Sequence, residues 1–144
     1  MITITFPIVL LVLLAIISII DWKFKAVPSI LLTSIIFITA VTHFKDLDQG
    51  VTSISFGILA FIFAYFLYEA DFIKGVADIK FIVIIGLMIS TISMFFISII
   101  LIMLYGIAYK MVFYFLFKDE SIEIPFIPAL YSVYVVLFIL GGVA

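Results

Sequence analysis

Apolar residues gather in long runs along the chain, and short polar segments separate these runs. Four of the runs occupy residues 4–20, 28–44, 51–68 and 126–142. An α-helix rises about 1.5 Å per residue and the hydrocarbon core of a bilayer is about 30 Å thick, so a spanning helix needs roughly 17–25 residues. Each run therefore predicts one transmembrane helix, and Pro28 suits the first turn of the second.

Residues 81–117 form a longer apolar run in which Lys110 is the only charge. A single helix of that length would extend about 55 Å, which is too long for one span, so the chain must fold back within it. The segment 90–93 (Ser-Thr-Ile-Ser) is the most polar point of the run and predicts the turn. A short fourth helix then begins near Asp78, and a long fifth helix ends near Phe117. The prediction is an all-α, polytopic integral membrane protein with six transmembrane helices.

Composition supports this prediction. Hydrophobic residues make up 68% of the chain and charged residues 11%, whereas a soluble domain is about half apolar and about a quarter charged. The net charge of −2 argues against a nucleic-acid partner, which requires a basic surface. The absence of cysteine excludes disulfides, thiolate nucleophiles and cysteine zinc sites. No Lys or Arg precedes the first apolar run, so we expect a permanent span there and a single transmembrane domain over residues 1–144.

The lysines orient the six predicted spans. With the N-terminus outside, only Lys45 is external, whereas a five-span arrangement would move Lys118 outside as well. The positive-inside rule therefore favours six spans in the cytoplasmic membrane, with both termini outside. The lysines expected on or near the cytoplasmic side are Lys23, Lys25, Lys74, Lys80, Lys110 and Lys118.

Two aspartates lie at the boundary of the apolar runs. Asp21 closes the first predicted helix and Asp78 opens the fourth, so both belong to the same face of the membrane. Placing an ionised acid in a low-dielectric environment costs free energy, so such an acid is usually paired, protonated or involved in the function of the protein. Two acids brought together share a proton, because both cannot ionise side by side. One can then take a proton from water while the other donates to a carbonyl oxygen, as in an aspartic peptidase. The alternative is a pair of solvated acids at helix ends.

Two short segments resemble the signatures of a known family. The segment "DWKFKAVPS", residues 21–29, resembles the first signature of the type IV prepilin peptidase and preflagellin (archaellin) peptidase family, an aspartate followed by Ile/Val-Pro. The segment "GVADIK", residues 75–80, resembles the second signature, Gly-x-Gly-Asp-x-Lys. The family's layout of six helices, with one aspartate ending the first and one starting the fourth, is similar over nearly the whole chain.

This resemblance implies roles for individual residues. Asp21 and Asp78 match the two catalytic aspartates. Ala77 stands where the signature has its second glycine, so a positive φ at that position would be strained. Lys80 either shapes the site or extends to lipid headgroups. The residues that we expect to shape the site are Gly75, which permits a sharp turn or a close approach, Ala77, Pro28 and Lys80.

The function that the resemblance implies is a membrane-embedded aspartic endopeptidase. It would cleave the leader peptide of prepilin-like or archaellin-like precursors at the cytoplasmic membrane boundary, with no metal and no organic cofactor. Its partners would be these precursors and membrane lipids. The chain is too short and lacks the cysteines for an added N-terminal domain, so it resembles the minimal, peptidase-only members.

The remaining cytoplasmic acids have two interpretations. They form an acidic rim that attracts the basic leader of a substrate, or they only keep the loops soluble. These acids are Glu69, Asp71, Asp119, Glu120 and Glu123. Two other classes of protein also stay open: a small transporter or channel component that uses the two aspartates as ion or proton ligands, and a structural partner of a larger membrane complex.

Overall fold

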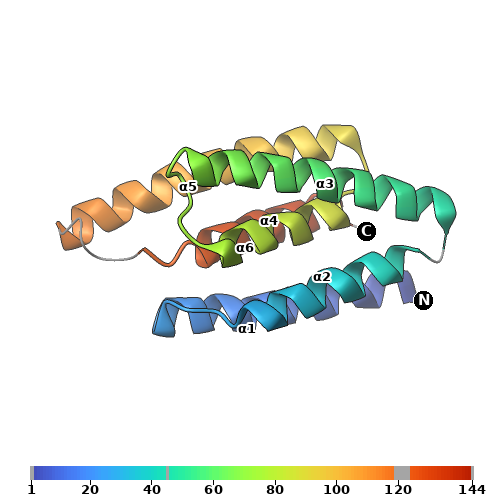
Figure 1. Cartoon of the computed structure of the whole chain (residues 1–144), viewed down its shortest axis with the longest axis horizontal. Helices are drawn as coiled ribbons and strands as arrows, with labels where there is room; N and C mark the ends of the chain where they lie inside the picture. The colour runs from blue at the N-terminus through green and yellow to red at the C-terminus, as the bar shows by residue number, and fades with distance from the viewer. Residues whose placement is uncertain (1, 45, 119–123, 144) are drawn as a thin grey trace.

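The computed structural model describes residues 2–44, 46–118 and 124–143, and it is all-α, with six helices (Figure 1). The predicted number of helices is confirmed, including the fold-back near residue 90, where three residues separate the fourth and fifth helices. The helices are α1 (Ile2–Phe24), α2 (Ser29–His43), α3 (Leu47–Glu69), α4 (Val76–Met88), α5 (Ile92–Phe117) and α6 (Ile127–Ile139).

Three helix boundaries differ from the prediction by three or more residues. The third helix was predicted to begin at residue 51 but begins at Leu47. The first helix does not close at Asp21 but continues for three more residues to Phe24, so Asp21 lies inside its last turn. The last helix was predicted to reach residue 142 but ends at Ile139. Gly141 follows with a φ of 69°, a left-handed conformation that ends a helix and that glycine adopts without strain.

Successive helices run in opposite directions along the long axis of the molecule (Figure 1). The C-terminal ends of α1, α3 and α5 therefore meet the N-terminal ends of α2, α4 and α6 at one end, which we call the aspartate end because Asp21 and Asp78 belong to it. All lysines of the described residues belong to this end as well, and both chain termini lie at the opposite end.

The helices fall into two length classes. α1, α3 and α5 have 23, 23 and 26 residues and are long and apolar enough to cross a membrane, which indicates a multi-pass membrane protein. α2 has 15 residues, and α4 and α6 have 13 each. At the usual helical rise, 13 residues cover only about 20 Å.

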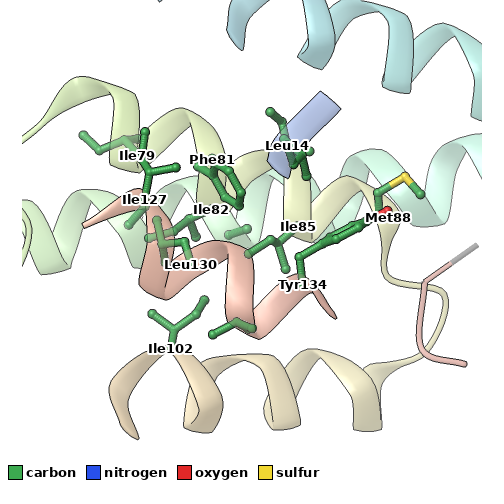
Figure 2. Close-up of a cluster of buried hydrophobic side chains, with 14 of the residues drawn as sticks. Leu14, Ile79, Phe81, Ile82, Ile85, Met88, Ile102, Ile127, Leu130 and Tyr134 are labelled. Atoms are coloured by element: carbon green, nitrogen blue, oxygen red, sulfur yellow. The ribbon is translucent and has the colours of Figure 1, made fainter. Parts of the chain in front are cut away.

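α4 occupies the centre of the molecule and packs against α2, α3 and α6. Nine of its residues are buried, which explains why it is apolar at almost every position rather than along one stripe. Figure 2 shows Ile82 and Ile85 of α4 near Leu130 and Tyr134 of α6, with Ile102 of α5 pointing toward the same cluster.

Small residues bring α3 and α4 unusually close together. A Cβ on Gly86 would lie 2.4 Å from the Ala60 Cβ and 2.7 Å from the Phe56 carbonyl oxygen. The Ser53 hydroxyl also donates a hydrogen bond to the Leu87 carbonyl oxygen across this contact. Small residues and interhelical hydrogen bonds are how helices associate in lipid, where the hydrophobic effect between them is absent.

The outward faces of the long helices are apolar. Ile58, near the middle of α3, is 56% exposed, and Leu104 of α5 is 59% exposed. Many other large apolar side chains of α1, α3 and α5 are exposed too. A soluble monomer rarely exposes a contiguous apolar surface of more than a few hundred Å². These faces are therefore suited to lipid.

Candidate active site at the aspartate end

Asp21 reaches the interior because it continues the buried stripe of α1. Leu10, Leu14 and Ile17 are almost fully buried, and the spacing of four, three and four residues places Asp21 on the same helix face. Its side chain is 7% exposed. Its Oδ2 atom accepts a hydrogen bond of 3.2 Å from the backbone N–H of Ile127, the first residue of α6. The first N–H groups of a helix lack partners within the helix and favour an anion, so α6 provides a natural partner for this carboxyl.

Asp78 is held at the N-terminus of its own helix. It is the third residue of α4, 7% exposed, and its Oδ2 accepts a hydrogen bond of 3.2 Å from the Gly75 N–H. This is the carboxylate half of a capping box. Gly75 lies close to the carboxyl, since a Cβ there would be 3.2 Å from Oδ2. A larger residue at this position would press directly on the carboxyl.

The two carboxyl groups line one cavity of about 350 Å³, which we call the aspartate cavity. They are close enough to interact electrostatically, although 57 positions separate Asp21 from Asp78 in the sequence. The structure therefore brings together the two residues that the sequence singles out. The other lining residues are Lys25, Ala26 and Val27; Phe72, Ile73, Lys74, Gly75 and Ala77; Lys110; and Ile124, Pro125 and Phe126.

The residues expected to shape the site divide into two groups. Gly75 and Ala77 line the aspartate cavity. Pro28 is exposed and precedes α2 as its N-cap, and it is not among the lining residues. Ala77 lies inside α4 and has no positive φ, so alanine costs no backbone strain at this position. The backbone strain expected for alanine at the position of the signature's second glycine is therefore absent.

Lys80 ties α4 to α2. Its Nζ atom donates hydrogen bonds to the hydroxyl of Ser29 and, at 2.7 Å, to the hydroxyl of Thr33. It also donates to the Ser29 carbonyl oxygen at 3.3 Å. These contacts join the N-terminal parts of two neighbouring helices. Lys80 thus shapes the aspartate end without lining the cavity.

Of the five acids expected to form an acidic rim, the structure describes two, and neither of them lines the aspartate cavity. Glu69 and Asp71 are exposed at the end of α3 and line a separate hollow of about 260 Å³, which shares Ile73 and Lys74 with the aspartate cavity. Apart from the aspartate pair, the charged lining residues of the cavity are lysines. The other three acids of the predicted rim, Asp119, Glu120 and Glu123, lie outside the described residues.

Two contributors to the site were missed in the sequence. The backbone N–H of Ile127 has no sequence signal, because every non-proline residue carries one. Lys110 did have a signal, as the only charge in the long apolar run, and it lines the aspartate cavity from α5. Among the described residues, no group of three or more His, Cys, Asp or Glu side chains could hold a metal ion.

Comparison with known proteins found no family, no curated protein and no solved structure that matches the chain. The chemistry of the site therefore follows from its own geometry. Two nearly buried carboxyls share one cavity, and each is fixed through Oδ2 by a backbone N–H at a helix N-terminus. Such a pair can accept and donate protons at neighbouring points.

Proposed function

We propose that this protein is a membrane-embedded aspartic endopeptidase that cleaves the leader peptide of prepilin-like or archaellin-like precursors at the cytoplasmic face of the cytoplasmic membrane. The observation that carries the proposal is the convergence of Asp21 and Asp78 in one cavity, in agreement with the two signature-like motifs. In this proposal all six helices cross the membrane and both termini lie outside.

The chemistry follows from a pair that holds one proton. The ionised carboxylate takes a proton from a water molecule as the water oxygen bonds to the substrate carbonyl carbon. The electron pair of the C=O π bond moves to the carbonyl oxygen, which takes the proton of the neutral carboxyl. When the C–N bond then breaks, the leaving nitrogen takes the proton that came from water. One hydroxyl of the intermediate returns its proton to the second carboxylate as the C=O bond re-forms, so the pair again holds one proton. The hydrogen bonds from Ile127 and Gly75 keep both carboxyls oriented during these transfers.

The depth of the aspartate cavity supports a site below the membrane surface. Beyond Lys110, residues 111–117 of α5 continue the helix for about 10 Å and are apolar, and most of their side chains are exposed, including Phe115 at 69%. Hydrocarbon would surround this extension, so the short helices α4 and α6 can begin below the surface. Irregular backbone is tolerated at such depth where it lines a cavity or is buried, as it is at Ile73 and Phe126.

The proposal is tested by replacing each aspartate in the purified protein. Asp21→Asn and Asp78→Asn should each abolish cleavage of a prepilin-like precursor, because half of the pair cannot both accept and donate a proton. Asp48→Asn, which neutralises an exposed acid in the first turn of α3, is the matched control and should cleave normally. Circular dichroism should show the same helicity for all variants. Near-normal cleavage by either aspartate variant would refute the mechanism. If the wild type cleaves no precursor but conducts protons into proteoliposomes, and both aspartate variants lose this proton flux, the result would favour a transporter.

The six-span arrangement has a separate test in this cysteine-free chain. Lys23→Cys, at the aspartate end, and Asp48→Cys, at the opposite end, should react with a membrane-impermeant thiol reagent from opposite sides. Reaction of both from the same side would exclude the topology. The unsubstituted chain should remain unlabelled and serves as the control.

A further inference from the structure

Lys110 is the only charged residue of α5; it is half-buried and lines the aspartate cavity. The Nζ atom lies 3.4 Å from the Asp71 carbonyl oxygen, to which it donates a hydrogen bond, and 4.6 Å from the centre of the Phe72 ring. A lysine in a membrane helix commonly extends along the lipid-facing surface to the headgroups. Lys110 instead lines the aspartate cavity, with its ammonium against the loop before α4. A charge kept inside a spanning helix generally serves a function.

Two aromatic rings and a glycine fix the position of Lys110. The Phe72 ring beneath the ammonium meets the Phe126 ring edge-on, with 5.8 Å between ring centres. Gly106, one turn before Lys110, makes room for both rings, since a Cβ there would lie 2.7 Å from Phe72 and 2.8 Å from Phe126. Phe72 belongs to the loop before α4 and Phe126 directly precedes α6, so α5 supports both segments that hold the aspartates.

The ammonium has donors left for a bound molecule. A lysine ammonium carries three N–H groups. Within the described residues, Lys110 forms one hydrogen bond, to the Asp71 carbonyl oxygen, and no ion pair. Its charge interacts with the charge of Asp78 at longer range. Two N–H donors and a full positive charge therefore remain for a group that enters the aspartate cavity.

We propose that Lys110 is a third catalytic residue of this cavity, whose ammonium donates a hydrogen bond to the carbonyl oxygen of the peptide bond that is cut. This inference rests on the proposed peptidase function. As the water oxygen bonds to the carbonyl carbon, negative charge develops on the carbonyl oxygen until the neutral carboxyl transfers its proton. Lys110 stabilises this charge and keeps its own protons throughout. A fixed donor aimed at developing charge lowers the barrier more than it tightens substrate binding.

A purely structural role for Lys110 predicts a different result. Through Asp71 and Phe72, the lysine would then only hold the loop before α4, and any variant that loosens this loop would act in the same way. Phe72→Leu removes the ring beneath the ammonium but leaves the charge in place. It therefore separates the catalytic role from the structural one.

The test compares kcat and KM of the full-length protein for a prepilin-like precursor. Lys110→Met should lower kcat by about 100-fold, as the loss of one donor to a developing oxyanion does, and leave KM nearly unchanged. Lys110→Arg, which keeps the charge and the donors, should recover part of the loss. Lys118→Met, at the residue that caps the C-terminus of α5 and lies outside the cavity lining, is the matched control and should match the wild type. If Lys110→Met does not fold, Lys110→Gln takes its place, with an expected loss of kcat of about 10-fold.

Each outcome has a distinct meaning. A normal kcat for Lys110→Met or Lys110→Gln, with Asp78→Asn inactive, overturns this inference and leaves the proposed function in place. If Lys110→Met and Phe72→Leu change kcat, KM and thermal stability in the same way, Lys110 has only a structural role, and this inference is also overturned. A wild-type protein that does not cleave the precursor overturns the proposed function and this inference together.

Discussion

The long helix α5 and the short helix α4 have similar composition and opposite surroundings. Both are apolar at almost every position. α4 buries nine of its 13 residues among other helices, whereas α5 buries only five of 26 and exposes large side chains such as Ile100 and Leu104. Apolar composition therefore does not distinguish a helix that faces lipid from one that faces protein. In this pair the exposed helix is the longer one, as expected if a helix that contacts lipid along its length has to match the thickness of the bilayer.

The difference in length also positions the site. Because α4 and α6 are short, their N-terminal N–H groups lie at the depth of the cavity and hold Asp78 and Asp21. The long helices α1 and α5 extend further toward the aspartate end, as Figure 1 shows. The inner helices thus supply the hydrogen-bond donors, and the outer helices supply the apolar surface around them.

The largest effect is expected at the contact between α3 and α4. Gly86→Val should destabilise the protein by about 3 kcal/mol or more, which is the upper end of the range for overpacked cores. The reason is that the backbone of α3 occupies the space that the valine side chain would need. Ala108→Val, on the exposed face of α5, is the control and should have little effect. The free energy of unfolding, measured by circular dichroism during SDS titration from bicelles, decides the matter. Equal stability of the two variants would contradict the central position of α4.

A charge on the outer surface tests whether that surface meets lipid. Ile58→Lys, near the middle of α3, should cost about 3 kcal/mol in a bilayer, because the 56% exposed side chain would place an ammonium in hydrocarbon. Leu47→Lys, at the first residue of the same helix and 74% exposed, should cost far less. Membrane insertion assays on the two variants give the comparison. If Ile58→Lys inserts as well as Leu47→Lys, the exposed faces do not contact lipid.

The smallest effect concerns a single hydrogen bond between an outer and an inner helix. Ser53→Ala should destabilise the protein by about 1 kcal/mol, because the Leu87 carbonyl loses its buried donor. Ser55→Ala removes a hydroxyl that bonds within α3, to the Val51 carbonyl oxygen, and should be nearly neutral. The difference between the two unfolding free energies isolates the interhelical bond. A difference of zero would mean that α3 and α4 are held by packing alone.

Much of the fold could be predicted from the sequence, because it depends on lengths and local chemistry. The length of the run 81–117 required a fold-back, and the structure has one at residues 89–91. The alternation of helix directions then placed Asp21 and Asp78 at the same end. These are properties of single helices and of their order along the chain, which the lengths of the apolar runs encode directly.

Only the tertiary structure decided what surrounds the aspartates. The partner of Asp21 is a backbone N–H 106 positions away in the sequence. Lys110 of α5 lines the cavity, whereas Glu69 and Asp71 line a neighbouring hollow. Each of these placements depends on how close two helices approach and at what depth a short helix begins. Side chains from several helices determine that packing jointly, so no single segment of the sequence contains it.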